Sequence, residues 1–228
     1  MTLQHVDIAF QLIAFLFAIS IHESAHAWMA NRRGDPTAYM LGRVSLNPIR
    51  HIDPVGTVLL PLIAAVSHFP MLGWAKPTPV NPRNFKDPVW DDILTSVAGP
   101  VSNFMVASAA VILLLGIKNT SALGQQIVTG IPFGIVSLEM NSPLVPASLL
   151  LYQLMTINIV LGVFNLIPVP PLDGSHVLRH FLSAPVLKIY DNVGMFALMA
   201  LVFLGGGLLG RIIFPVVGIF NYLLLRVG

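Results

Sequence analysis

Two histidines and a glutamate lie close together in the stretch IHESAHAWMA, residues 21–30. His22 and His26 are four residues apart, so on an α-helix their side chains lie one turn and about 40° apart on the same face. Both imidazole rings can therefore reach one metal ion. Glu23 lies beside them, close enough to contact a water molecule on that metal without being a ligand. This H-E-x-x-H arrangement predicts two zinc ligands and a general base.

A zinc site that keeps one position open for water needs a third protein ligand. The chain has only ten acidic residues, and most of them lie in polar stretches or near the termini. Asp173 is the best candidate, because it ends the apolar run NLIPVPPLDG, where an unpaired carboxylate would be costly. Asp53 is the second candidate, because it opens another apolar run; it lies beside His51, with which it can pair. An Asp-Gly pair also fits a solvated turn, so the residues alone leave the role of Asp173 open.

Other polar residues near these motifs have less specific interpretations. Asn165 and Asn103 are neutral hydrogen-bonding groups close to backbone breaks or helix contacts. Each fits a substrate clamp or oxyanion donor, and each fits an interhelical hydrogen bond about equally well. His176 follows Asp173 by three residues, and a position beside the metal or at the surface suits it better than a ligand role.

The chain that must position these residues has the composition of a membrane protein. Of its 228 residues, 55% are hydrophobic and 10% are charged, whereas soluble domains average about 25% charged residues. We therefore expect a lipid bilayer around it. A net charge of +2 without a long basic run gives no case for nucleic-acid binding. The absence of Cys excludes disulfides and thiolate metal ligands.

About five or six membrane helices are expected along the chain. Residues 8–30, 93–117 and 145–167 are each long and apolar enough to cross a hydrocarbon core of about 30 Å. Three prolines interrupt residues 54–72, which predicts a kinked or re-entrant helix. Residues 193–226 are broken at GGGLLGR, which favours two short helices over one long one.

Two polar stretches predict short extended or β-like segments associated with the membrane. Residues 34–53 contain the strand-like pieces TAYML and RVSL, and residues 73–92 contain four prolines without a helical period. The expected fold class is therefore an all-α polytopic membrane protein with such segments. We expect one membrane-embedded domain over the whole chain, with a catalytic core at about 8–180 and an apolar helical region at 193–226.

Taken together, these motifs resemble the site-2 protease family of intramembrane zinc metalloproteases. The resemblance runs from about residue 10 to residue 180. It rests on HESAH in the first span, AGPVSN in a middle span and FNLIPVPPLDG in a later one. The stretches GDPTAYMLGRVSLNPIRHIDPVGT and GWAKPTPVNPRNF are similar to the compact bacterial and archaeal branch, which carries no PDZ domain.

The resemblance implies roles for individual residues. One zinc ion is implied, and its ligands are His22, His26 and Asp173. Glu23 is implied as the catalytic base. Asn165 matches the family's asparagine that helps to bind substrate near the zinc. Asn103 matches a family position in the middle span, and it is a second candidate for substrate binding.

The expected function is that of an intramembrane zinc metalloprotease. Such an enzyme hydrolyses peptide bonds within transmembrane segments of membrane protein substrates, here in the plasma membrane of a prokaryote. The main alternative is a membrane metal-binding or metal-transport protein that uses the same two histidines and aspartate. A transporter has little need for a base beside its ligands, so Glu23 separates the two hypotheses. A protease with a third glutamate ligand would depend on Glu139, which lies in no suitable helical motif.

Overall fold

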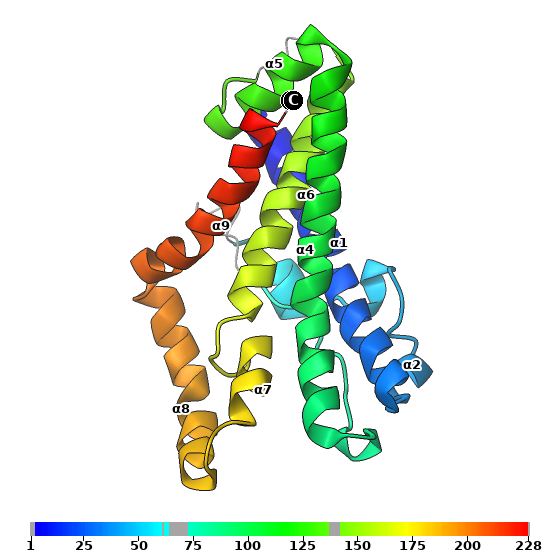
Figure 1. Ribbon diagram of the computed structural model, residues 1–228, viewed down its shortest axis with the longest axis vertical. Helices are drawn as coiled ribbons and strands as arrows, with labels where there is room; N and C mark the ends of the chain where they lie inside the picture. The colour runs from blue at the N-terminus through cyan, green and yellow to red at the C-terminus, as the bar shows by residue number, and fades with distance from the viewer. Residues whose placement is uncertain (1–2, 61, 64–72, 137–141, 228) are drawn as a thin grey trace.

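A computed structural model describes residues 3–60, 62–63, 73–136 and 142–227 of the chain. The described residues form long α-helices and contain no β-strand (Figure 1). Five of the helices are long and apolar enough to cross a membrane. They are α1 (Leu3–Arg33), α4 (Pro88–Thr120), α6 (Leu144–Asn165), α8 (Ala184–Phe203) and α9 (Gly206–Arg226). The expectation of an all-α polytopic membrane protein is confirmed.

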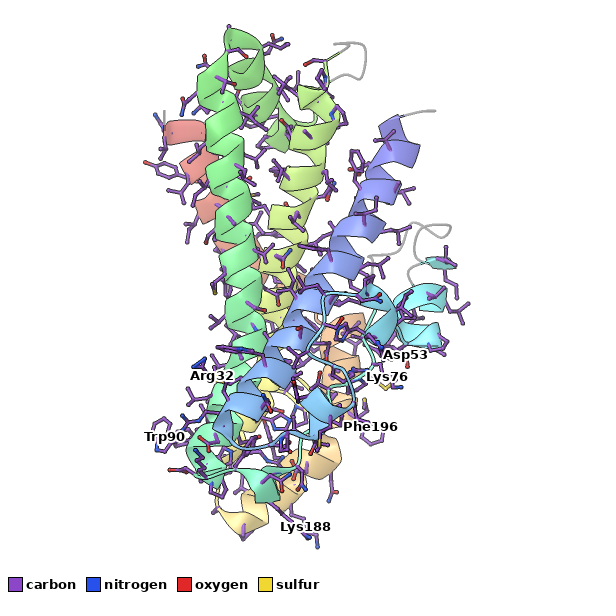
Figure 2. The ribbon with its side chains drawn as sticks, turned by 90° about the vertical axis from the view of Figure 1, so that its right-hand side faces the viewer. Arg32, Asp53, Lys76, Trp90, Lys188 and Phe196 are labelled. Atoms are coloured by element: carbon purple, nitrogen blue, oxygen red, sulfur yellow. The ribbon has the colours of Figure 1, made fainter. Side chains whose placement is uncertain are left out.

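Helices α1, α4 and α6 pack together as the core of the molecule. α4 and α6 run alongside each other, and α1 crosses them at an angle (Figures 1 and 2). The side chains between α4 and α6 are small or aliphatic, and they include Ala107, Ala110, Leu114, Met155 and Ile159. On α1 the most completely buried apolar positions are also small, with Ala14, Ala18, Ala27 and Ala30 at most 1% exposed. Small side chains let membrane helices approach closely, which brings polar groups on different helices within hydrogen-bonding reach.

Helices α8 and α9 lie beside this core as a pair of connected helices (Figure 1). The helical structure is interrupted between them at Leu204 and Gly205, so the predicted pair of C-terminal helices is confirmed. α8 begins earlier than predicted, at Ala184. Much of the apolar surface of both helices points outward, which suits contact with lipid.

The polar stretch after α1 consists of turns and short helices, where strand-like pieces were expected. TAYM forms a single helical turn, α2 (Thr37–Met40). The side chain of Asp35 accepts a hydrogen bond from the Thr37 N–H at 3.1 Å, which starts the turn and overrides the β propensity of these residues. Two further short helices follow, η1 (Pro48–Arg50) and the π-helical η2 (Pro54–Leu59). Most of the kinked helix expected at 54–72 lies outside the described residues.

Residues 73–81 are extended and lie against α1 and the loop after it, without forming a sheet. Asp35 is fully buried and accepts hydrogen bonds from the Asn81 N–H and the Asn84 side chain, at 2.7 and 2.8 Å. Burial alone would raise the pKa of Asp35, but its hydrogen bonds with Thr37, Asn81 and Asn84 outweigh burial and hold that pKa below its ordinary value. Asp35 therefore anchors the extended segment as an ionised group.

Four other short elements complete the described chain. They are η3 (Pro82–Asn84), α5 (Ala122–Gly130), η4 (Ile131–Phe133) and α7 (Asp173–Arg179). α7 is the important one for the site, because it packs against α4 and begins at Asp173.

Candidate metal centre

The H-E-x-x-H residues lie in the C-terminal part of α1, below its charged end. Arg32 and Arg33 form the last turn of that helix. At 1.5 Å per residue, His26 and His22 lie about 10 and 16 Å from Arg33 along the helix axis. Figure 2 shows Arg32, Trp90 and Lys188 toward the same end of the molecule. The two histidines therefore lie well inside the part of α1 that is long and apolar enough to cross a membrane.

Three side chains converge on one point, as the sequence predicted. The Nε2 atoms of His22 and His26 are 3.1 Å apart. Oδ2 of Asp173 lies 3.1 Å from the first and 3.4 Å from the second. Both histidines are buried, with 5% and 8% exposure. Among the described residues, this is the group of His and acidic side chains whose ligand atoms lie close enough together to hold a metal ion.

The hydrogen bonds of the two Nδ1 atoms determine whether the Nε2 atoms carry a proton or a lone pair. Nδ1 of His26 donates a hydrogen bond to the backbone carbonyl of Thr95 at 2.7 Å, because a carbonyl can only accept. Nδ1 of His22 is 2.6 Å from Oδ1 of Asn103, whose amide nitrogen donates to Asn158. Both Nδ1 atoms therefore carry the proton, and both Nε2 atoms present lone pairs to the centre.

This donor set fits a zinc ion. Two imidazole lone pairs face each other and a carboxylate oxygen, and three such atoms repel one another unless a cation lies between them. Oδ2 of Asp173 is buried and has no hydrogen-bond partner, which is costly for a carboxylate that binds no cation. Two histidines and a carboxylate are a ligand set of catalytic zinc sites. Nδ1 hydrogen bonds of this kind orient the ligands of such sites.

Gly99 on α4 provides the space in which the two rings lie. A Cβ atom at this position would lie closer than 3.0 Å to ring atoms of both His22 and His26. Gly99 belongs to the AGPVSN motif, and its structural reason is close approach of the α4 backbone to the imidazoles. From the sequence, this glycine was only one letter of the AGPVSN motif. Its contact with the rings could not be predicted, because the rings come from a helix about 70 residues away.

A proline-rich turn brings Asp173 to the histidines. Residues 166–172 connect α6 to α7, and prolines there prevent the helix from continuing. Gly174 follows the ligand and lies against the carbonyl of Leu166, with no room for a Cβ atom. The short helix α7 therefore starts at Asp173, with the carboxylate directed back at α1.

Glu23 follows His22 on α1 and is held by the extended segment. Its Oε2 accepts hydrogen bonds from the Thr78 N–H at 2.9 Å and from the Thr78 hydroxyl at 2.7 Å. Neighbouring N–H groups on the same edge of the segment bind loop carbonyls, Trp74 to Gly56 at 3.1 Å and Lys76 to His51 at 2.8 Å. Among the described residues, Glu23 is outside the group that can share a metal ion, and its role as a base stays a prediction.

A buried arginine fixes the same segment from the other side. Arg43 is 5% exposed, and its guanidinium donates to the backbone carbonyls of Arg50, Lys76 and Pro77. Burial lowers the pKa of Arg43, and the nearby negative charge of Glu23 acts in the opposite direction. Arg43 thus places a positive charge near Glu23 and ties two loops together.

The two asparagines named as candidate substrate contacts lie in different surroundings. Asn103 is fully buried, where its Oδ1 contacts His22 and its Nδ2 donates to Asn158 at 2.8 Å. These contacts fit the interhelical hydrogen bond better than a substrate clamp. Asn165 is partly exposed at the end of α6, and its Nδ2 donates to the carbonyl of Leu161 at 2.9 Å. Its substrate-binding role stays a prediction.

Asp53, the second candidate for the third ligand, has a structural role. Its side chain accepts hydrogen bonds from the N–H groups of Val55 and Gly56, at 3.0 and 2.7 Å, and so begins η2. His51 does not pair with it. Instead, Nε2 of His51 contacts the carbonyl of Ser45 at 2.7 Å.

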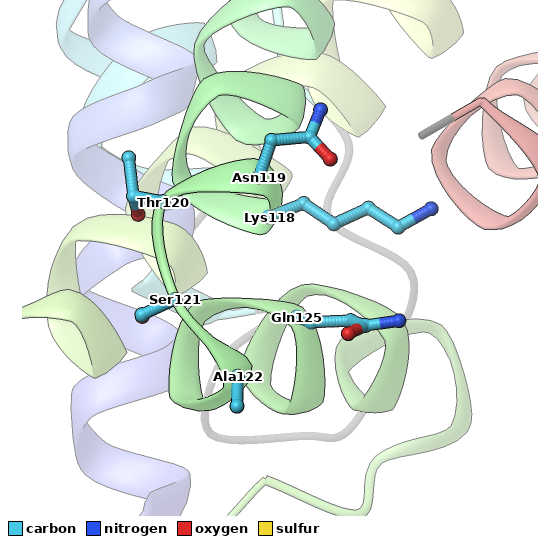
Figure 3. A pocket seen from close by; sticks show the side chains of 6 residues that line it. All are labelled: Lys118, Asn119, Thr120, Ser121, Ala122 and Gln125. Atoms are coloured by element: carbon cyan, nitrogen blue, oxygen red, sulfur yellow. The ribbon is translucent and has the colours of Figure 1, made fainter.

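A surface pocket of about 330 Å³ lies at the opposite end of α4 (Figure 3). Its lining comprises Lys118, Asn119, Thr120, Ser121, Ala122 and Gln125. The Lys118 ammonium already donates to three backbone carbonyls at the end of α9, those of Leu224, Leu225 and Val227. This lysine therefore stabilises the C-terminus of α9 and is not free to bind an anion.

Apolar helices around a buried cluster of two histidines and one aspartate define a multi-pass membrane protein with a metal centre. Residues 10–205 match peptidase family M50, the family of the site-2 proteases, and the chain belongs to this family. It is a zinc-dependent membrane metalloprotease, as the sequence predicted.

Two curated relatives are named as zinc metalloproteases. The zinc metalloprotease YwhC of Bacillus subtilis is 38% identical over 172 residues, which are 74% of this chain and 67% of that protein. The zinc metalloprotease MJ0392 of Methanocaldococcus jannaschii is 43% identical over 79 residues, 32% of this chain and 23% of that protein. No solved structure matches the chain significantly.

Proposed function

We propose that this chain is an intramembrane endopeptidase, a single membrane-embedded domain that hydrolyses peptide bonds within transmembrane segments of other proteins. The observation that carries the proposal is the convergence of Asp173 on His22 and His26, which lie about 16 and 10 Å from Arg33 along the apolar helix α1. A site at this depth is within reach of a substrate's transmembrane segment. Its relatives in bacteria and archaea support a location in the plasma membrane of a prokaryote.

In this proposal His22, His26 and Asp173 hold one zinc ion. Zinc supplies Lewis acidity there, which makes water a nucleophile at neutral pH and polarises the scissile carbonyl. Glu23 takes the proton from water at Oε1, because Thr78 occupies Oε2. The same carboxyl group then delivers that proton to the leaving amine. Thr78 restrains the carboxylate through Oε2 and leaves Oε1 for the proton.

The extended segment 73–81 supports a path for the substrate past Glu23. Alternate N–H groups at 74, 76 and 78 are directed to the enzyme's own acceptors. In an extended chain the residues between them face the other edge. Two of these, Pro77 and Pro79, have no N–H, and the Pro77 carbonyl already accepts from Arg43, so that edge offers an unwound substrate few hydrogen-bonding groups. Strand addition of a substrate to this segment would therefore be limited to a few hydrogen bonds, donated by substrate N–H groups.

The substitution Glu23→Gln tests the proposed base. It keeps the size of the side chain and its contact with Thr78, but it cannot take up a proton. We expect the purified variant to retain one zinc per chain, by elemental analysis, and to cleave a single-span test substrate at least about 100-fold more slowly. Asp173→Ala is the companion variant, and it should lose the zinc as well as the activity.

A metal-transport function gives a different result in the same experiment. A carrier that uses this site would bind zinc and show no zinc-dependent cleavage in the wild type. Glu23→Gln with wild-type cleavage, or Asp173→Ala with wild-type zinc content, would rule out the assigned roles.

A further inference from the structure

A second cluster of ionisable side chains links α4 to α7, outside the proposed ligands. The Asp92 carboxylate lies between two histidines that are one turn apart on and just after α7. Its Oδ2 is 2.8 Å from Nε2 of His180, and its Oδ1 is 3.6 Å from Nδ1 of His176. Asp92 is buried, with 9% exposure. Neither the ligand set nor the proposed base uses any of these three residues.

α7 needs an external support, because it is too short to hold its own orientation. It has seven residues, and helices of this length are unstable in isolation. No side chain caps its N-terminus at Leu172. The first residue of this helix is nevertheless the proposed ligand Asp173, whose Oδ2 has no hydrogen bond of its own. The direction of that carboxylate therefore depends on how α7 is fixed to the rest of the molecule.

The other two proposed ligands are both oriented by α4. Thr95 on α4 accepts the hydrogen bond of His26, and Asn103 on α4 accepts that of His22. Asp92 is one turn before Thr95 on the same helix and binds the helix that carries Asp173. One helix, α4, thus contacts both elements that carry the three proposed ligands, α1 and α7.

We propose that Asp92, through His176 and His180, is a positioning residue that sets Asp173 against the two histidine ligands. The proposal rests on the ligand roles given under the proposed function. Asp92 fixes α7 on α4, and a fixed α7 keeps the Asp173 carboxylate within reach of the zinc. When the contact is lost, α7 becomes free to shift, and the zinc site must order its third ligand on binding.

A second metal ion is the competing interpretation of two histidines and an aspartate. The geometry favours positioning, because each histidine approaches a different oxygen of Asp92. Among the described residues, the group with ligand atoms within 4.8 Å of one another is the one at His22, His26 and Asp173. The cluster at Asp92 does not meet that criterion.

The test is the zinc affinity of the purified full chain in detergent, measured by competition with a chelator of known affinity. We expect Asp92→Asn and His180→Gln each to bind zinc about 10- to 100-fold more weakly, the range for residues that orient ligands. The double variant should bind no more weakly than Asp92→Asn alone, since both remove one contact. The stoichiometry should stay at one zinc per chain in each of them.

Asp191→Asn is the matched control. Asp191 on α8 pairs with Arg179 of α7 at 3.1 Å, and both side chains are substantially exposed. Its loss removes an ion pair to the same short helix from the other side, and exposed pairs of this kind contribute little. We expect wild-type zinc affinity from this variant. Thermal unfolding of the metal-free proteins should place Asp92→Asn and Asp191→Asn close together, so that the difference is specific to zinc.

Three results would overturn the proposal. Wild-type zinc affinity in Asp92→Asn and His180→Gln would show that the contact does not act on the site. An equal loss in Asp191→Asn would reduce it to general support of α7. A second zinc in the wild type that disappears in Asp92→Asn would make the cluster a metal site itself. Asp173→Ala separates these failures from the failure of the ligand assignment, because zinc retained by that variant contradicts the assignment alone.

Discussion

The two histidine ligands are held by hydrogen bonds of different kinds. His26 donates to a backbone carbonyl, that of Thr95, whose position the helix itself fixes. His22 contacts a side chain, Asn103, which is kept in place by Asn158 on α6. The ring of His22 therefore depends on a buried chain of amides that connects all three core helices. Removing the acceptor would leave a buried ring N–H without a partner, which costs about 1–3 kcal/mol.

Substitution of Asn103 should act on zinc binding rather than on substrate binding. We expect Asn103→Ala to weaken zinc affinity about 10- to 100-fold, because His22 loses the acceptor that fixes its tautomer and orientation. Asn103→Asp should restore most of the affinity, since a carboxylate accepts the same hydrogen bond. Chelator competition measures both. Unchanged zinc affinity in the alanine variant, with a raised KM for substrate, would favour the substrate-binding role predicted from the sequence.

At this scale the sequence identified the reactive groups better than their supports. The four-residue spacing of His22 and His26 was enough to predict a shared metal ion, and the scarcity of acids made Asp173 the best candidate for the third ligand. The family resemblance was needed to prefer Asp173 over a solvated turn, and the structure brings the three side chains together. The role of Asn103 was undecided, because an asparagine suits a substrate and a helix contact equally. Thr95 gave no signal at all, since its contribution is a backbone carbonyl that every residue possesses.

Helix α4 is the element on which the site is built. It contacts α1, α6 and α7, and it carries the acceptors for both histidines. Its backbone must come close to the imidazoles, and Gly99 permits that approach. A side chain there would push α4 away from α1 or turn the rings out of the site.

Gly99→Ala should therefore abolish or strongly weaken zinc binding in a protein that keeps its helices. The added Cβ atom would lie closer than 3.0 Å to both rings, and neither ring can move without losing its Nδ1 hydrogen bond. Gly116→Ala on the same helix is the control, because nothing lies within 4 Å of its Cβ position. Elemental analysis and circular dichroism on the two variants make the comparison. One zinc per chain in Gly99→Ala would contradict this description of the site.

Hydropathy predicted the long helices, and local contacts decided the shorter pieces. The spans at 8–30, 93–117 and 145–167 correspond to α1, α4 and α6; α1 and α4 extend a few residues beyond the prediction at both ends, and α6 ends two residues before it. Those extensions are polar or charged turns, such as Arg32 and Arg33, which no hydropathy threshold includes. The prediction of a strand at TAYML was wrong, because the hydrogen bond from the Thr37 N–H to the Asp35 side chain, rather than the β propensity of these residues, determines the backbone conformation there.

In the molecule as a whole, the zinc ligands lie toward one end and the apolar helices surround them. At the opposite end of α4, well away from the histidines, the Lys118 side chain donates to a carbonyl in the last turn of α9 (Figure 3). α8 and α9 present mostly apolar surface outward. The sequence predicted the apolar C-terminal helices but not where they pack. The contact of α9 with α6 depends on the shapes of the two helix surfaces, and no sequence motif marks it.

The position of the scissile bond tests the central claim most directly, that this site cleaves within the bilayer. Wild type and Glu23→Gln would be reconstituted in liposomes with a single-span test substrate, and mass spectrometry of the products would map the cleavage. We expect wild type to cut inside the transmembrane segment, about 10 to 16 Å from its end at 1.5 Å per residue. Glu23→Gln, with its zinc bound, should give no product. Cleavage confined to the flanking hydrophilic residues, or undiminished by Glu23→Gln, would contradict the claim.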